Sequence, residues 1–202
     1  MLASGAGTNL QAILDGVHGR GGIEVVAVGS NNPDAMALER ARGAGIEAAV
    51  FERADYDDRE SRDRAIGDWV ADLGVDLIVL AGYMELLSAQ FVARFRNRVI
   101  NVHPALLPSF PGLDAVQQAL DHGVKVTGVS VHFVDEGVDS GPIILQRAVE
   151  VPDSRGWDDL EERIHAVEHE LLPGAIRLIA AGAVRIDERN PRLVRIASNR
   201  AR

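Results

Sequence analysis

Apolar runs of strand length alternate along this chain with segments in which apolar residues recur every three or four positions. The short runs predict strands at 24–28, 48–51, 77–81, 99–103, 128–134 and 143–149. The longer periodic segments predict helices at 10–17, 36–44, 59–73, 88–96, 115–122 and 158–180. This alternation is typical of an α/β protein with a mostly parallel sheet flanked by helices.

The second half of the chain departs from this rhythm. No helix separates 128–134 from 143–149, so we expect these two strands to pair antiparallel. Proline removes a backbone donor and its ring clashes with the preceding turn of a helix. We therefore expect Pro173 to kink or divide the predicted helix at 158–180.

The length and composition favour one domain over residues 1–202. The chain is 47% hydrophobic, and no segment has the composition of a linker. Only Met1 to Ala3 precede the first glycine-rich turn, so we expect a first strand that is short or truncated. Residues 183–202 are expected to form a C-terminal extension, with the basic stretch 189–202 a solvated end.

Charge and cysteine content narrow the class of protein. The chain has no cysteine, and its six histidines lack a metal-binding spacing, so no metal is expected. A net charge of −9 argues against a nucleic-acid or anionic-membrane partner. The apolar stretch 77–87 is too short to span a bilayer, and no secretory signal precedes the domain, so we expect a cytoplasmic protein.

The segment Ser4-Gly5-Ala6-Gly7-Thr8-Asn9 is a candidate phosphate site. Its glycines permit a tight turn, and the helix that follows offers free N–H groups to an anion. A dinucleotide fingerprint would need a third glycine where Leu10 stands, so a monophosphate ligand fits better. A plain strand-to-helix connection is the alternative.

Asn101 and His103 are the candidate catalytic pair. In a strand at 99–103 their side chains point to the same face, and Pro104 ends the strand beside them. Asp139, in the loop 135–142, could hold an imidazolium and raise the pKa of His103. The alternatives are a satisfied histidine at a buried strand end and an ordinary acidic turn.

Five segments together carry a family resemblance. They are Ser4–Asn9, Ala81–Met84, Asn101–Pro108, Gly128–Val134 and Asp139 through Ile144. In this order and spacing the chain resembles the phosphoribosylglycinamide formyltransferases, from Leu2 to about Ile179. The resemblance implies a Rossmann-like formyltransferase fold, with a mostly parallel twisted sheet and an antiparallel C-terminal part.

The resemblance also implies an activity and its partners. The enzyme would transfer a formyl group from the co-substrate 10-formyltetrahydrofolate to the amine of glycinamide ribonucleotide, in purine biosynthesis and without a metal. A tetrahedral oxyanion would form, with Asn101 donating to it and a protonated His103 stabilising it. Asp139 would keep His103 charged and help to move the proton of the amine. Monomer and homodimer both stay open.

Binding residues follow from the same resemblance. The ribonucleotide would be held by Gly7, Thr8, Asn9 and Glu168. The folate would lie along Met84, Glu85, Leu86 and Leu87, beside Asn101 and with Arg59 near its acidic end. Taken by themselves, Arg59, Glu85 and Glu168 would be solvated charges. Glu85 stands where family members often carry a basic residue, which argues against a side-chain salt bridge to the folate.

Three alternatives are weighed against this function. A 10-formyltetrahydrofolate hydrolase resembles the chain, but usually carries an additional N-terminal regulatory domain. Methionyl-tRNA formyltransferase shares the histidine segment, but has a C-terminal tRNA domain for which the residues after Ala181 are too few. A noncatalytic nucleotide- or folate-binding module would not need Asn101, His103 and Asp139 together.

Overall fold

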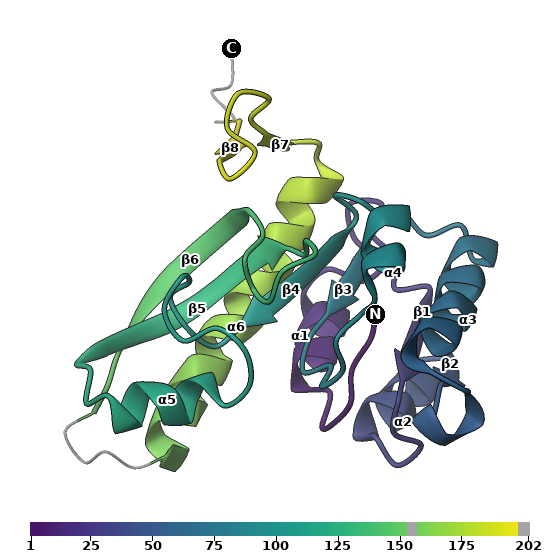
Figure 1. The fold of residues 1–202 in the computed structure, drawn as a ribbon, viewed down its shortest axis with the longest axis horizontal. Helices are drawn as coiled ribbons and strands as arrows, with labels where there is room; N and C mark the ends of the chain where they lie inside the picture. Colours follow the sequence, from purple (N-terminus) through teal and green to yellow (C-terminus); the bar gives the residue numbers. More distant parts are fainter. Residues whose placement is uncertain (153–156, 198–202) are drawn as a thin grey trace.

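A computed structural model describes residues 1–152 and 157–197 (Figure 1). The helices are α1 (Thr8–Gly16), α2 (Met36–Gly43), α3 (Arg59–Asp72), α4 (Ala89–Arg94), α5 (Ala115–Asp121) and α6 (Trp157–Ala180), with a 3-10 turn η1 (Arg53–Asp55). The strands are β1 (Ala27–Ser30), β2 (Glu47–Val50), β3 (Ile78–Leu80), β4 (Val99–His103), β5 (Val126–Phe133), β6 (Ile143–Glu150), β7 (Val184–Ile186) and β8 (Val194–Ile196).

The sheet is parallel in its first half and antiparallel in its second. β1 pairs with β2, and β3 with β4, in parallel; β5 pairs antiparallel with both β4 and β6. Leu2 lies between the two parallel pairs, with a parallel bridge to Gly29 on one side and to Leu80 on the other. The predicted mixed α/β architecture is therefore confirmed.

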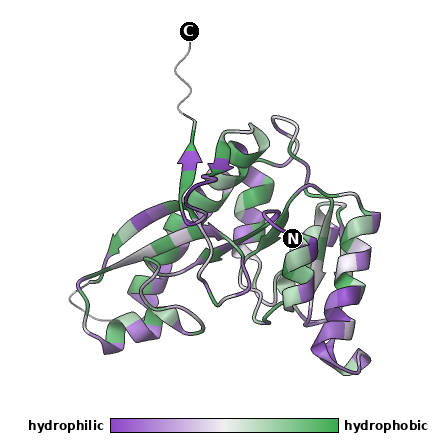
Figure 2. Ribbon diagram, turned by 45° about the horizontal axis from the view of Figure 1, so that its top comes forward, coloured by the Kyte–Doolittle hydropathy of each residue, from purple (hydrophilic) through white to green (hydrophobic). Residues whose placement is uncertain are grey.

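Helices cover both faces of the sheet because side chains alternate along each strand. On β3, Ile78 and Leu80 pack with residues of α3 and α4, whereas Val79 packs with residues of α1 and α6. Figure 1 shows α6 running behind β4, β5 and β6, with α3 and α4 at the other end of the molecule. The helices carry both hydrophilic and hydrophobic positions, as amphipathic helices of such layers do (Figure 2).

The helix α6 corrects one prediction. It runs unbroken from Trp157 to Ala180 with Pro173 inside it, so of the two expected outcomes the division of the helix is wrong, and a kink at Pro173 stays a prediction. Buried Leu171 and Leu172 precede the proline and buried Ala175 and Ile176 follow it. Tertiary packing on both sides of the proline thus outweighs the lost backbone bond.

Strand β1 and the C-terminal segment also differ from the predictions. β1 begins three residues later than expected, at Ala27, because the preceding Val25 gives its N–H to His18 Nδ1 at 3.0 Å rather than to a strand. Residues 184–196 hold the antiparallel pair β7–β8, which was not predicted, and Leu193 bridges to Ile143 of β6, although residues 189–197 are mostly exposed, as expected of a solvated end. The rest of the predicted basic tail, 198–202, lies outside the described residues.

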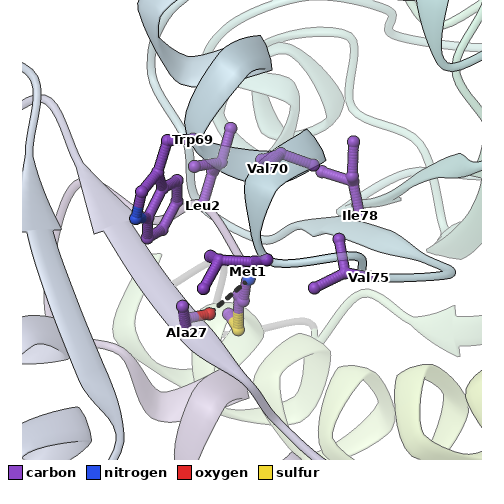
Figure 3. A pocket seen from close by; sticks show the side chains of 8 residues that line it. Met1, Leu2, Ala27, Trp69, Val70, Val75 and Ile78 are labelled. Carbon is purple, nitrogen blue, oxygen red and sulfur yellow. Dashed lines mark hydrogen bonds between the residues drawn. The ribbon is translucent and has the colours of Figure 1, made fainter.

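A small apolar pocket lies where the chain starts (Figure 3). Its lining is formed by Met1, Leu2, Ala27, Trp69, Val70, Leu73, Val75 and Ile78. The Met1 amino group donates a hydrogen bond to the Ala27 carbonyl at 2.8 Å, and burial lowers the pKa of this amine to about 5. Such an apolar lining is unsuited to a charged substrate.

Candidate active site

The polar residues predicted for the site meet at one edge of the sheet. Leu2 bridges to Leu80, and Leu80 pairs in register with Asn101 of β4, all in parallel. The segments that follow Leu2, Leu80 and Asn101 therefore leave the sheet in the same direction. Ligands of open α/β sheets gather at such carboxyl ends. The structure accordingly brings the glycine turn, the segment after β3 and the histidine of β4 to one edge.

Asn101 and His103 both contact Asp139 there. His103 Nδ1 lies 3.4 Å from Asp139 Oδ2, and Asn101 Nδ2 donates to Asp139 Oδ1 at 3.4 Å. The side chain of His103 is 5% exposed and that of Asp139 15%. The Gly112 N–H donates to Asp139 Oδ2 at 2.8 Å. The loop between β4 and α5 thus holds the carboxylate in place. The sequence-based pairing of these three residues is thus matched by the geometry.

His132 is a member of this cluster that the sequence reasoning missed. It lies directly across from Asn101 in the β4–β5 pair, so the two side chains share a face. Its Nδ1–H donates to the Phe133 carbonyl at 2.9 Å, and its Nε2 lies 3.3 Å from Asn101 Nδ2 and 3.5 Å from Asp139 Oδ1. The strand register reveals its place, and a sequence without known pairing does not provide that register.

The charge state of His103 corrects another prediction. Burial lowers the pKa of His103 below its ordinary value of 6.5 and outweighs the attraction of Asp139 and the hydrogen bond to the Phe110 carbonyl, which act in the opposite direction. The expected raised pKa is wrong, because desolvation penalises the charged imidazole more than the carboxylate favours it. His103 is therefore mainly neutral at neutral pH, with Nε2–H donating to the Phe110 oxygen at 2.8 Å.

Asp139 keeps its negative charge in the same surroundings. Burial acts to raise the pKa of this carboxyl, but the hydrogen bonds from His132 and Gly112 and the neighbouring histidines outweigh it, so the pKa is lowered. The cluster at neutral pH thus contains an ionised carboxylate beside a neutral imidazole. That combination stabilises a proton arriving on His103.

A loop of fixed conformation closes over β4. The Leu107 N–H donates to Ser130 Oγ at 3.0 Å, and Ser130 Oγ–H donates to the Ala105 carbonyl at 2.6 Å. Gln146 of β6 donates to the Leu107 carbonyl at 2.9 Å. These bonds tie the residues after His103 to β5 and β6, and so place the Phe110 carbonyl against the imidazole.

The glycine turn joins the last long helix. Gly7 caps α1 in the left-handed conformation, with φ 69°, and leaves the first N–H groups of the helix without a side-chain cap. Asn9 Nδ2 donates to Glu168 Oε2 of α6 at 2.8 Å, so two predicted substrate-binding residues 159 positions apart are in contact. The helix N-terminus offers free N–H groups to an anion, and this polar pair lies beside it at the same corner of the edge.

Two properties of this corner point to a polar ligand. Asn9 is 8% exposed, and its Oδ1 has no hydrogen-bond partner among the described residues. Burial raises the pKa of Glu168, against the hydrogen bond from Asn9 and the attraction of His165. A buried amide oxygen without a donor is costly to a protein, and a ligand hydroxyl or amine would satisfy it.

The predicted folate segment, 84–87, follows β3 at the same edge. The Met84 N–H donates to Ser4 Oγ of the glycine turn at 2.9 Å, which places the two predicted ligand segments side by side. Met84 and Leu86 are 64% and 60% exposed. Exposed apolar side chains beside a polar cluster suit a flat aromatic ligand with a few polar groups.

The charged residues predicted for this segment have different surroundings. Arg59 lies on the first turn of α3 and is paired with Glu60 at 3.4 Å, close to the solvated charge expected of it without the resemblance. Glu85 is not a solvated charge, because its Oε2 lies 3.1 Å from Nη1 of the buried Arg62. The sequence contains a signal for Arg62, since it precedes the buried Ile66 and Val70 at intervals of four along α3.

Comparison with known proteins assigns the class that this fold and site define. The family model described as formyl transferase matches residues 1–176, and the chain belongs to that family. Its relatives within the family are the phosphoribosylglycinamide formyltransferases. The proteins of that name from Haemophilus influenzae and Bacillus subtilis are 41% and 39% identical to this chain, over 93% and 88% of it and 89% and 91% of their own lengths.

Solved structures agree with the curated relatives. Glycinamide ribonucleotide transformylase 1 from Symbiobacterium toebii is 51% identical and superimposes with a TM-score of 0.92, covering 98% of this chain and 92% of that one. The chain also matches trifunctional purine biosynthetic proteins, such as that of Bos taurus at 42% identity, but it spans only 19% of that protein's length. The predicted family and fold are confirmed.

Proposed function

We propose that this chain transfers the formyl group of 10-formyltetrahydrofolate to the amine of glycinamide ribonucleotide, a step of purine biosynthesis. The observation that carries the proposal is the contact of Asn101 and His103 with Asp139, at the edge of the sheet where both predicted ligand segments lie. Its support from relatives is the shared name of the curated proteins that this chain matches over most of both lengths.

The chemistry begins with attack of the amine nitrogen on the formyl carbon. A new C–N bond forms, the carbonyl oxygen becomes an oxyanion, and the attacking nitrogen carries a surplus proton. Neutral His103 accepts that proton, directly or through a water, and Asp139 stabilises the resulting imidazolium. The C–N10 bond of the folate then breaks, and the leaving nitrogen takes a proton from the imidazolium. Tetrahydrofolate and the formylated amide are released.

Asn101 is proposed to stabilise the oxyanion. Its two side-chain contacts, to His132 and Asp139, are long at 3.3 and 3.4 Å. Neutral N–H···O bonds are strongest near 2.9–3.0 Å, so an oxyanion would offer this amide a better acceptor than it has. Removing one such donor in other acyl-transfer sites costs roughly 3 kcal/mol of transition-state stabilisation.

The two substrates are assigned to the two ligand segments. The phosphate and ribose of the ribonucleotide would bind at Gly7, Thr8 and Asn9. The free N–H groups of the helix would donate to the phosphate, and Asn9 Oδ1, which has no partner among the described residues, would accept from a hydroxyl. Glu168 would receive the polar groups near the amine. The pterin of the folate would lie along 84–87, and Arg59, on the exposed start of α3, would meet the acidic tail.

The experiment is a formyl-transfer assay with purified protein and 10-formyltetrahydrofolate. We expect tetrahydrofolate to appear together with formylated glycinamide ribonucleotide, in equal amounts and only when the ribonucleotide is present. Release of tetrahydrofolate and formate without the ribonucleotide would instead identify a hydrolase. Binding of both ligands without turnover would identify a noncatalytic module.

A further inference from the structure

A buried ion-pair cluster lies behind the predicted folate segment. Arg62 and Asp63, adjacent on α3, have side chains that are 1% and 0% exposed. Arg62 Nη2 donates to Asp63 Oδ1 at 3.2 Å, and Arg62 Nη1 lies 3.1 Å from Glu85 Oε2. A buried charge is retained at a cost unless it is paired, so a fully buried arginine on a helix requires a carboxylate partner, and Arg62 has two.

This cluster holds one end of the segment after β3. Asp63 Oδ2, the oxygen not used by Arg62, accepts the Ser88 N–H at 2.5 Å. Ser88 is the N-cap of α4, and its Oγ accepts the Phe91 N–H at 3.3 Å. The start of α4 is therefore fixed to α3 by the carboxylate that neutralises Arg62.

The other end of the segment is fixed to the glycine turn. Ser4 Oγ accepts the Met84 N–H at 2.9 Å and donates to Asn31 Oδ1 at 2.6 Å. Asn31 Nδ2 in turn lies 3.5 Å from Glu85 Oε1. Glu85 thus contacts both Arg62 of α3 and Asn31, which is hydrogen-bonded to Ser4 of the glycine turn.

We propose that Arg62 is a positioning residue for the formyl-folate site, which fixes Glu85 and thereby holds the segment 84–87 in its binding conformation at the sheet edge. The inference rests on the proposed function, because it takes 84–87 as the segment that contacts the folate. Glu85, whose charge alone would not suit an acidic ligand, has a structural reason to be present. Its carboxylate is directed to a buried guanidinium.

The direction in which the KM for the folate changes when Glu85 is neutralised separates this positioning role from a simple electrostatic one. The folate carries an acidic tail, and a nearby carboxylate repels it. If Glu85 acted only through that repulsion, its neutralisation would lower the KM for the folate. If Glu85 acts as the anchor of the segment, its neutralisation loosens the segment and raises the KM.

The test uses Glu85→Gln, which leaves Arg62 paired with Asp63 and so preserves the buried charge balance of α3. The matched control is Asp68→Asn, which removes the carboxylate of an exposed pair between α3 and α4, where Arg94 Nη1 lies 2.7 Å from Asp68 Oδ1. Both variants remove one negative charge beside an arginine. Only Glu85→Gln removes a tie to the segment.

In Glu85→Gln we expect the KM for 10-formyltetrahydrofolate to rise about fivefold, the loss typical of one hydrogen bond of ordinary strength, with kcat changed by less than about twofold. Amide hydrogen exchange in a peptide covering 84–88 should become faster. Asp68→Asn should change neither quantity.

An unchanged or lowered KM in Glu85→Gln, or unchanged exchange in 84–88, would overturn the positioning role. A wild-type protein that transfers no formyl group would refute the proposed function instead. In that case the exchange measurement still decides whether Glu85 fixes the segment, so the two failures are distinguishable.

Discussion

The burial of His103 affects the pKa of its imidazole more strongly than the neighbouring carboxylate of Asp139 does. Its imidazole is almost fully buried between β4 and the loop that presents the Phe110 carbonyl. Burial favours the neutral ring, while Asp139 favours the charged one, and burial is the larger effect. A neutral ring beside an ionised carboxylate is prepared to receive a proton, which is the state a general base needs before reaction.

Replacement of this base tests the assignment directly. In His103→Ala we expect the formyl-transfer rate to fall by about 10²–10⁴, the contribution typical of general acid–base catalysis. The melting temperature and ribonucleotide affinity should stay close to wild type, because Gly7 and Asn9 belong to other elements. The measurements are kcat and calorimetric ribonucleotide binding. His18→Ala, in the turn that follows α1, serves as the control histidine and should retain activity.

Asp139→Asn tests the electrostatic part of the cluster. The negative charge of Asp139 acts to raise the pKa of His103 against the larger effect of burial. Neutralising Asp139 should therefore lower that pKa further below 6.5. The charged form of His103 would then disappear at a lower pH than in wild type as the pH rises. An NMR titration of the His103 ring would give both values. A higher pKa in the variant would contradict the pairing.

Single residues of the site were predictable to the extent that local patterning decides their position. Alternation along 99–103 places Asn101 and His103 on one face whatever the sheet order. His132 needed the register of β5 against β4, which local pattern does not contain. The spacing along α3 places Arg62 on the buried face, but its two carboxylate partners are known only from the structure. The protonation of His103 depended on burial depth, which is a property of the assembled core.

At the scale of elements, the glycine turn and the start of α2 are packed against each other. A Cβ placed on Gly7 would lie 2.7 Å from the Ala37 Cα, which is closer than real side chains approach. The Ala37 N–H donates to the Gly5 carbonyl at 3.1 Å, so the two segments are also hydrogen-bonded. Gly7 is therefore required both by its left-handed backbone and by this contact.

Gly7→Ala should destabilise the protein more than its backbone conformation alone explains. The left-handed conformation costs a residue with a Cβ about 1–2 kcal/mol, and the forced contact adds about 1–3 kcal/mol. Gly21→Ala isolates the first effect, because Gly21 has φ 61° and no atom near its Cβ position. Thermal unfolding of both variants gives the comparison. Equal melting temperatures would show that the turn tolerates the contact.

Elements were predicted best where a local signal ends them. β4 was expected at 99–103 and is found there, because Pro104 cannot continue a ladder. β1 was displaced because His18 takes the N–H of Val25, a contact that hydrophobic pattern does not reveal. The β7–β8 pair was missed because its strands are short and rich in arginine, and one of its supports is a bridge to β6.

At the scale of the whole molecule, the sheet aligns the two proposed ligand segments beside the cluster of Asn101, His103 and Asp139. The Met84 N–H and the glycine turn are in direct contact through Ser4, and Leu80 next to them pairs with Asn101. No helix among the described residues is long and apolar enough to cross a membrane. The molecule thus presents a continuous edge on which two ligands can lie end to end.

A bisubstrate mimic, joining a ribose phosphate to a folate analogue, should therefore bind much more tightly than either half. Linking two ligands that occupy adjacent subsites commonly raises affinity by about 10²–10⁴ over each one. Calorimetric titration with the mimic and with each half would measure the gain. Affinity no better than that of the stronger half would place the two segments too far apart for one reaction.

The hydrogen bond between Asn9 and Glu168 has a consequence for biosynthesis. Its two partners are 159 positions apart, so a ribosome that has made Asn9 needs roughly 10 to 30 seconds more to deliver Glu168. A nascent chain that ends after β6 already contains every strand from β1 to β6, yet its nucleotide corner lacks the carboxylate on α6. If Glu168 holds the ribonucleotide as proposed, the emerging protein therefore acquires all six of these strands before its ligand corner is complete, and that corner is completed only when the last long helix docks.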